Sequence, residues 1–347
     1  MSTIKTELSR ILDAISIVSP ALFLFRGEPV PVTPGPAQPI PGFPHHPLPQ
    51  MPLTRQLQAT LYSCCYAQRI EDQQPAPNAA AFTPDPSFAA SLSANNRTQS
   101  RWEGGWLVYA VGPGGQVSLQ KGDRQRFALP GEFLSHGAPG MPPQTGTIVS
   151  VFVPRESAAA QPGFFFVYGE SLSDVWDEHN LLRFYFHVSP EVAPDLLAYL
   201  TGSLNRRLAP FKMKTLSEPG LYPRTDAMVL YLAKRYYDVA VRVVREMPVE
   251  LGMRLGSSTP LFTLPVQPGV GCAEDPNTGE SFGMNRCRLT AEGIVDAWRK
   301  GKNTTDQRLN TIAQRFAQEG FDLDRPHLNP GSVELSEVPE KVEFAYA

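Results

Sequence analysis

The sequence predicts an α+β fold: a mixed, largely antiparallel sheet with flanking helices, preceded by an amino-terminal helical segment with a proline-rich linker. Two patterns lead to this prediction. Short apolar or alternating runs separated by Gly and Pro fill the middle of the chain, and apolar residues recur at helical spacing towards both ends. With 42% hydrophobic and 19% charged residues among 347, a well-buried core is feasible. We expect residues 1–80 to hold the amino-terminal helices and the proline-rich segment, and residues 81–347 to form the α+β domain.

The first part of the chain alternates helical and proline-rich stretches. Residues 4–15 predict an amphipathic helix, because their apolar side chains recur three or four positions apart. The segment Pro29–Pro52 is too rich in proline for a helix or a central strand, so we expect an extended linker, with a PxxP-type ligand as the alternative. Apolar residues between 57 and 64 mark a second helix, and another stretch rich in Pro, Ala and Asn covers residues 73–96.

The remainder reads as strands first and then as mixed elements. The predicted strands of the middle region span residues 106–111, 117–120, 147–153 and 164–168. Several of their connections are short, which favours antiparallel pairing. The last third predicts strands at 182–188, 211–216 and 227–232, and helices at 192–208 and 237–247, followed by a helix that starts at the capping box of Thr304 and Gln307 and stops at Gly320.

Composition excludes several classes of function. A formal net charge of -3 argues against a broad nucleic-acid footprint. The apolar stretch Ile15–Phe25 is too short to span a bilayer, and no secretory signal is expected. The four cysteines fit no zinc motif and predict reduced, mostly buried thiols, as in a cytoplasmic protein. Fingerprints for metals, dinucleotides and nucleotide phosphates are absent, so we expect no metal and no organic cofactor.

Two predicted strands carry the residues with the most chemistry. In residues 183–188, alternation places Arg183, Tyr185 and His187 on one face. In the strand after Pro210, Lys212 and Lys214 share a face in the same way. If these two strands are adjacent, one face of the sheet is apolar and the other brings all five polar side chains together.

The polar face suits an anion and proton transfer. Two amines on one strand face lower each other's pKa when partly desolvated, and a neutral lysine is a base near pH 7. An imidazole such as His187 can donate or accept a proton at that pH, and the guanidinium of Arg224, in the turn that follows, suits phosphate or carboxylate. The competing interpretation is a solvated outer face with a structural histidine.

A second candidate is the loop Asp275–Arg286, before a helix that we expect to start near Thr290. Loops that contain glycine present backbone N–H groups to anions, and Arg286 adds a positive charge. The alternative is an ordinary polar loop.

Four runs, taken in order, resemble the HopA family of type III effectors and its bacterial relatives. They are Arg183–His187, Pro210–Lys214, Arg224–Tyr231 and Ser281–Arg286, with Asn96–Arg97 and Trp102–Trp106 upstream, and the similarity covers roughly residues 55–320. The resemblance implies a phosphoserine/phosphothreonine lyase, because such relatives are paired with a kinase and make dehydrated, ribosomally synthesised peptides.

Carried over by position, the resemblance implies that Lys214 is the general base and His187 the general acid. It also implies that phosphate is held by Lys212, Arg224 and Arg286. The runs are also similar to the phosphothreonine lyases among type III effectors, whose pattern has a lysine two residues before the histidine, where this chain has Tyr185. Either Arg183 or Tyr185 takes over that role, or phosphate is held less tightly, or catalysis is lost.

The resulting hypothesis is a lyase that β-eliminates phosphate from a phosphorylated precursor peptide, giving dehydroalanine or dehydrobutyrine. It implies a separate kinase as a partner and needs neither nucleic acid nor membrane. The alternative, which the departure at Tyr185 favours, is a non-catalytic protein that binds a phosphopeptide or a host protein.

Overall fold

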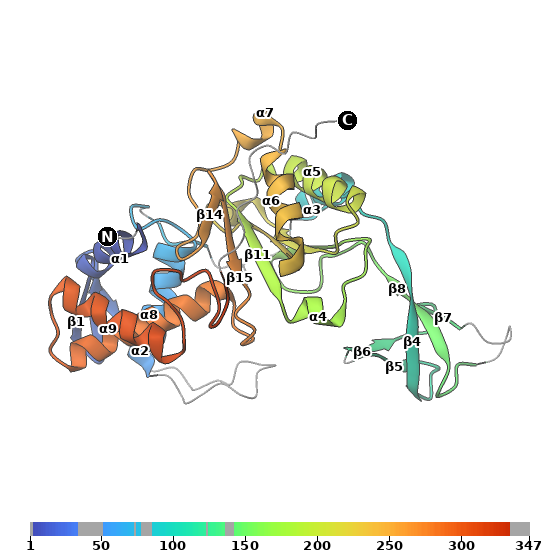
Figure 1. The fold of residues 1–347 in the computed structure, drawn as a ribbon, viewed down its shortest axis with the longest axis horizontal. Helices are drawn as coiled ribbons and strands as arrows, with labels where there is room; N and C mark the ends of the chain where they lie inside the picture. Colours follow the sequence, from blue (N-terminus) through green and yellow to red (C-terminus); the bar gives the residue numbers. More distant parts are fainter. Residues whose placement is uncertain are drawn as a thin grey trace, which may run out of the picture.

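The computed structural model describes residues 3–33, 51–72, 74–77, 85–122, 124–135 and 142–333. It confirms the predicted α+β class, with helices around three antiparallel sheets. A cluster of helices lies at one end, the largest sheet lies in the middle, and a five-stranded sheet stands away from the rest at the other end (Figure 1). Among the described helices, none combines the length and the apolar character needed to cross a membrane.

The amino-terminal region shares a core with the carboxyl-terminal helices. Its elements are α1 (Thr3–Asp13), a three-stranded sheet of β1 (Ile15–Ser19), β2 (Leu22–Phe25) and β3 (Glu28–Pro31), and α2 (Pro52–Leu61), which a π-helical turn at Tyr62–Tyr66 extends. Helix α2 packs on α8 (Phe282–Arg299), and α1 packs on α9 (Thr305–Gln318). Apolar side chains between residues 8 and 76 and those of the carboxyl-terminal helices lie in one buried cluster.

Two predictions for this region need correction. Ile15 begins a strand instead of ending the first helix, and the start of the expected linker forms the edge strand β3. Proline fits there because an edge strand does not need every N–H for pairing. Most of the remaining linker, residues 34–50, lies outside the described residues.

Helix α3 (Pro86–Asn95) lies within the stretch rich in Pro, Ala and Asn at residues 73–96, for which the sequence predicted no helix. The Asp85 carboxylate accepts hydrogen bonds from the N–H groups of Ser87, at 2.8 Å, and Phe88, at 3.2 Å. Pro86 stands in the first turn, where its missing N–H costs nothing. The Asp-Pro pair was the available helix-start signal.

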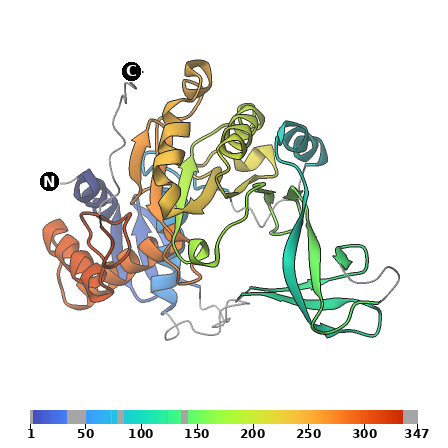
Figure 2. The same cartoon turned by 45° about the vertical axis from the view of Figure 1, so that its right-hand side comes forward.

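The five-stranded sheet, which we call the arm sheet, has the order β6-β5-β4-β8-β7. Its strands are β4 (Arg101–Val111), β5 (Val117–Lys121), β6 (Arg124–Ala128), β7 (Phe133–Ser135) and β8 (Ile148–Val153). It projects beside the central sheet in both ribbon views (Figures 1 and 2). Its own core is small and centres on Trp106, which is 2% exposed.

The central sheet has the order β14-β15-β11-β13-β12-β10-β9, and every pair of neighbours is antiparallel. Its strands are β9 (Glu156–Ser157), β10 (Phe164–Tyr168), β11 (Leu181–Phe186), β12 (Lys212–Leu216), β13 (Met228–Ala233), β14 (Leu264–Gln267) and β15 (Val270–Glu274). The short helix α4 (Val175–Glu178) precedes β11. The expectation that β11 and β12 are neighbours is wrong, because β13 folds back and pairs with both of them.

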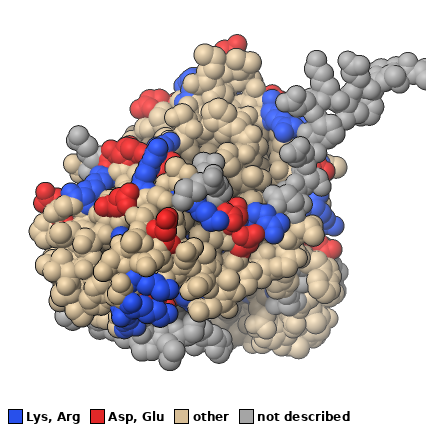
Figure 3. All heavy atoms as spheres, turned by 60° about the vertical axis from the view of Figure 1, so that its left-hand side comes forward, with Lys and Arg blue, Asp and Glu red and all other residues tan. Residues whose placement is uncertain are grey.

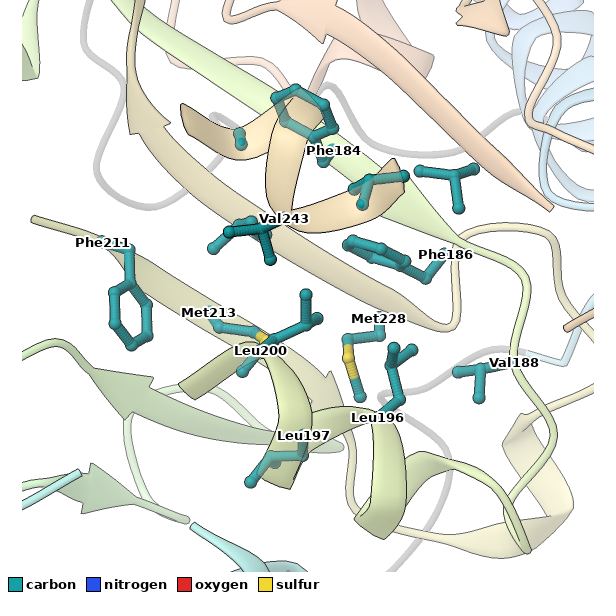
Figure 4. Packing of buried hydrophobic residues seen from close by; sticks show 14 of the residues in the cluster. Phe184, Phe186, Val188, Leu196, Leu197, Leu200, Phe211, Met213, Met228 and Val243 are labelled. Atoms are coloured by element: carbon teal, nitrogen blue, oxygen red, sulfur yellow. The ribbon is translucent and has the colours of Figure 1, made fainter. Parts of the chain in front are cut away.

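One face of the central sheet carries the main core. Phe184 and Phe186 of β11 and Met213 of β12 point towards α5 (Ala193–Arg206). There they pack in one cluster with Leu196 and Leu200 of that helix (Figure 4). Helix α6 (Tyr237–Arg245) packs there too, followed by the short α7 (Val249–Gly252). The alternation predicted for β11 and β12 therefore places apolar residues as expected, and leaves the opposite face for the polar side chains.

The carboxyl-terminal helices pack as an antiparallel pair. The capping box of Thr304 and Gln307 at the start of α9 is confirmed, and Gly320 follows this helix with φ +79°. Helix α8 starts at Phe282 instead of near Thr290, with Ser281 as its N-cap. The sequence predicted Gly283 to lie in a loop, but it lies inside the helix. A Cβ at this position would lie 2.3 Å from the buried Tyr66 ring, so the packing requires glycine here.

The surface over these terminal helices carries charges of both signs. Figure 3 shows basic and acidic side chains next to each other in mixed groups on the described part of this face. The four cysteines are free thiols, and three of them, Cys65, Cys272 and Cys287, are buried.

Candidate functional site

The face of the central sheet opposite α5 and α6 brings together polar side chains from three strands. Directly paired residues share a face, so Lys214 of β12, Val229 of β13 and Tyr185 of β11 form one row. Lys212, Tyr231 and Arg183 form the next row. We call Arg183, Tyr185, Lys212, Lys214 and Tyr231 the polar face. The insertion of β13 moves the lysines one strand further from β11 but keeps them on the predicted side.

The two lysines rest on aromatic rings of β10. The Nζ of Lys214 lies 4.3 Å from the ring centre of Phe164, and that of Lys212 lies 4.9 Å from the ring centre of Phe166. Within the described residues, neither amine forms an ion pair with a carboxylate. Burial and, after it, the positive charge of Arg183 lower the pKa of Lys214 to about 8, against the opposing effect of Asp226. Burial also lowers the pKa of Lys212, which is the more exposed of the two.

Arg183 is held at the edge of the polar face. Its Nε donates to Asp275 Oδ2 at 2.7 Å, and its guanidinium lies over the Tyr231 ring at 5.3 Å. Burial opposes its charge, but the phenols of Tyr185 and Tyr231 and the carboxylate of Asp275 raise the pKa of Arg183 overall. This guanidinium adds a permanent positive charge, part of which Asp275 neutralises.

Tyr185 occupies the position, two residues before His187, where the lyase pattern described above has a lysine. Its ring packs edge-on against Tyr66, with 6.3 Å between ring centres, and the side chain is 3% exposed. Burial raises the pKa of its phenol well above the ordinary range. The hydroxyl lies beside Arg183 and Tyr66 but meets hydrogen-bond geometry with no described residue. The side chain is therefore neutral and offers one O–H donor where an amine would offer a charge.

His187 follows the end of β11 on the side of the polar face. Backbone bonds of 2.8 Å to Gly269 and Gly256 fix its main chain, and a Cβ at Gly256 would lie 2.3 Å from its Nδ1. Burial lowers the pKa of His187, while the Ser258 backbone and the carboxylates of Asp72 and Asp226 oppose that shift. Its Nδ1 is buried without a hydrogen-bond partner among the described residues. Strand geometry puts its Cα roughly 12 Å from that of Lys214. A substrate held between these two side chains is within reach of both.

The structure does not leave Arg224 free for phosphate. Its guanidinium donates to both carboxylate oxygens of Asp226, at 2.8 and 3.0 Å, to the Tyr62 hydroxyl at 3.1 Å and to the Pro77 carbonyl at 2.9 Å. A side chain that is 7% exposed and already paired with a carboxylate acts as a structural anchor. It contributes to the polar face only through its charge, which lowers the pKa of Lys214.

Arg286 is not part of the polar face, contrary to the prediction. It lies inside α8, is 0% exposed, and its guanidinium sits 3.9 Å from the Phe321 ring centre. Its donors bond the carbonyl oxygens of Pro326, at 2.7 Å, and Leu328, at 3.1 Å. The guanidinium therefore ties the carboxyl-terminal segment to α8. Sequence reasoning placed it in a loop because the helix start was misplaced.

Two carboxylates that the sequence reasoning passed over affect the site. Asp275 pairs with Arg183, and Asp226 acts electrostatically on both Lys214 and His187. The closeness of Asp226 to Arg224 in the sequence was an available signal, since short Arg-x-Asp turns form ion pairs. Among the described residues, no group of His, Cys, Asp and Glu has the arrangement of a metal site.

A cavity of about 680 Å³ adjoins the polar face at the end of Lys212. Lys212 and Tyr231 line it from the central sheet, and Arg101, Arg124 and Arg126 line it from the arm sheet. Of the polar face, Lys212 and Tyr231 therefore border the cavity, while Arg183, Tyr185 and Lys214 are not part of its lining.

Comparisons with known proteins give one family match and two similar solved structures. The model of the HopA1 effector protein family matches residues 155–328, which include β11, β12, β13 and the start of α8. Two solved effector structures are similar at 16% identity. The effector from Pseudomonas syringae pv. tomato strain DC3000 has a TM-score of 0.42, with 80% of this chain and 95% of that chain covered. The effector from Pseudomonas syringae pv. syringae strain 61 has a TM-score of 0.41, with 78% and 88% covered.

Comparison with curated proteins finds no match. The assignment rests on the family match, which covers half of the sequence and contains every strand of the polar face. The chain belongs to the HopA1 effector protein family.

Proposed function

We propose that this chain is a phosphoserine/phosphothreonine lyase that acts on a phosphorylated peptide. A base removes the proton from Cα, the electron pair of that bond forms the Cα=Cβ double bond, and the Cβ–O bond breaks. Phosphate leaves with a proton from a general acid, and the product is dehydroalanine or dehydrobutyrine. The observation that carries the proposal is the Lys214 amine, whose pKa of about 8 makes it a usable base at neutral pH.

The other residues of the polar face take supporting roles. Lys212 is exposed and has no carboxylate partner among the described residues, so it is the proposed phosphate ligand. Arg183 supplies a fixed positive charge beside the developing enolate. His187 is the proposed general acid. Arg224 and Arg286 drop out of the proposed phosphate site, because protein groups already bond their guanidinium groups.

The protonation states limit the rate. Burial lowers the pKa of His187 and lowers that of Lys214 to about 8, so only a minor fraction of molecules holds the protonated imidazole and the neutral amine at the same time. A phosphate dianion between them would raise both pKa values and favour the protonated histidine. We therefore expect a bell-shaped pH dependence of kcat/KM, with the alkaline limb near pH 8.

The test is phosphate release from a phosphothreonyl peptide, followed by mass spectrometry for loss of the elements of phosphoric acid. We expect Lys214→Ala and His187→Ala each to reduce the rate by about a hundredfold or more. Lys214→Arg keeps the charge but not the base and should be equally slow. Lys300→Ala, at an exposed position after α8, is the matched control and should retain full activity. Undiminished release by Lys214→Ala would refute the assigned base.

The competing function is binding of a phosphopeptide without chemistry. The neutral Tyr185 favours this binding function, because the position that holds a lysine in the lyase pattern contributes no charge in this chain. The same assay separates the two functions. Binding of the phosphopeptide with no change in its mass, across pH 6 to 9, would favour the binding protein.

A further inference from the structure

The cavity between the arm sheet and the central sheet is lined by four acidic and four basic residues. Four carboxylates line it, and each is paired with a cation: Glu103 with Lys121, Glu178 with Arg124, Asp177 with Arg235 and Asp275 with Arg183. Three lining cations, Arg101, Arg126 and Lys212, have no carboxylate partner within the described ranges. Lys121, Arg235 and Arg183, which do not line the cavity, pair with three of its four acids, and this is why three lining cations are left without a carboxylate partner.

These three cations come from three strands and face the same space. Arg101 on β4 donates to the Gly169 carbonyl at 2.5 Å, while its Nε is buried without a hydrogen-bond partner among the described residues. Arg126 on β6 donates to the Phe152 carbonyl at 3.0 Å. Each guanidinium donates one hydrogen bond to a backbone carbonyl. This bond fixes the position of the guanidinium and leaves other N–H donors for a ligand.

Tyr168 connects the arm sheet to the polar face. It is the direct cross-strand partner of Lys212, and the charge of Arg126 acts on its phenol. The ion pair of Arg124 with Glu178 of α4, at 3.5 Å, closes the cavity from the other side. A chain of groups thus runs from Arg126 through Tyr168 to Lys212, the residue at the edge of the proposed reaction site.

We propose that this cavity binds acidic side chains of the substrate peptide, next to the serine or threonine that is modified. This inference rests on the proposed function for its substrate, and it adds a sequence preference for Asp or Glu near the modified residue. Guanidinium groups match carboxylates in geometry. The lining also holds four carboxylates, which repel a continuous phosphodiester backbone more than they repel single carboxylate side chains.

The experiment measures binding, so that it does not depend on turnover. A labelled, unphosphorylated peptide with a central threonine flanked by glutamates is titrated with the full chain, and fluorescence anisotropy gives Kd. We expect the glutamine-flanked peptide to bind about five- to twentyfold more weakly. Arg126→Gln should remove most of that difference, and the affinity of the wild-type chain for the glutamate peptide should fall as salt is raised.

Controls separate a site from a general charge effect. Arg254→Gln removes an exposed guanidinium that pairs with Asp195, away from the cavity lining, and should keep the preference for glutamate. Arg101→Gln is the second cavity variant, and thermal unfolding reports whether it still folds. If Arg126→Gln folds and keeps the full preference, the proposal fails. Equal affinity for a single-stranded oligonucleotide of the same charge would also overturn it.

The outcome is distinguishable from that of the lyase assay. A preference for glutamate that depends on Arg126, in a chain that releases no phosphate, would support the cavity and refute the lyase. Phosphate release from acidic and neutral phosphopeptides with equal Kd would support the lyase and refute the cavity.

Discussion

At the scale of single residues, two buried cations show how partners decide the role of a charge. The guanidinium of Arg286 bonds two backbone carbonyls, so its charge holds the carboxyl-terminal segment on α8. The Lys214 amine has an aromatic ring as its neighbour and no carboxylate partner among the described residues. Burial without a partner favours the neutral amine, which is the state that a base needs.

The same burial predicts that Lys214 costs stability. A folded-state pKa of about 8, below the ordinary 10.5, means that folding disfavours the charged form below pH 10.5. Lys214→Met should therefore raise the free energy of unfolding at pH 7 by on the order of 1–3 kcal/mol, less the lost contact of the amine with the Phe164 ring. The gain should be complete below about pH 8 and should vanish as the pH rises to 10.5.

Urea denaturation of both chains between pH 7 and pH 10.5 measures this difference. Lys300→Met, at the exposed position after α8, is the control and should change stability little at any pH. A clear loss of stability in Lys214→Met at pH 7 would mean that the fold favours the charged amine, and the proposed base would lose its support.

At the scale of elements, the contact between α8 and α9 depends on a glycine. A Cβ at Gly293 would lie 2.7 Å from the Ile312 Cα, so the two backbones approach more closely than any larger residue permits. Helix α8 carries Arg286 and packs against α2, and Phe282 at its start contacts Tyr66. Tyr66 in turn packs against Tyr185, so the start of α8 lies on the same side of the central sheet as the polar face and belongs to the cluster that covers Tyr185.

Gly293→Ala should consequently destabilise the protein by about 1–3 kcal/mol, because α9 must move away from α8. Gly252→Ala in α7 is the matched control, since nothing lies within 4 Å of its added Cβ. Alanine is the better helix former, so this control should leave stability unchanged or raise it by up to about 1 kcal/mol. The midpoint of thermal unfolding compares the two, and a Gly293→Ala variant as stable as its control would show that the helices can separate without cost.

At the scale of the whole molecule, the arm sheet and the central sheet differ in how much core supports them. The arm sheet buries seven apolar residues in its own cluster and exposes large apolar side chains such as Phe127 on its surface. The central sheet carries a core on each face, with α5 and α6 on one side and Tyr66, Phe282 and their neighbours on the other. Local stability follows buried apolar contact, so the two sheets should open at different free energies.

Hydrogen exchange should therefore be faster in the arm sheet. We expect paired amides of β4 and β8 to exchange at least about tenfold faster than those of β11 and β13, because fewer buried contacts break when the arm opens. Exchange followed by mass spectrometry of peptic fragments measures this. Equal protection of both sheets would show that they unfold as one cooperative unit.

Local patterns in the sequence were sufficient for the class of fold and for the side of the sheet on which the candidate residues of β11 and β12 lie. The alternation in residues 183–188 and 211–214 predicted the polar face, since strand geometry has a period of two. The capping box predicted the start of α9 because Thr304 and Gln307, which form it, are only three residues apart in the sequence. These features depend only on neighbours along the chain.

Pairing order and ion-pair partners came from the tertiary structure alone. Nothing in the residues near β11 and β12 shows that β13 inserts between them, because strand order depends on packing across long loops. Arg224 and Arg286 looked like free cations until the fold placed carboxylate or carbonyl oxygens against them. The cavity beside Lys212 likewise exists only because the arm sheet, distant in sequence from β12, lies against it. The charge and solvation of a side chain depend on neighbours in space, and these are decided by the packing of the whole chain.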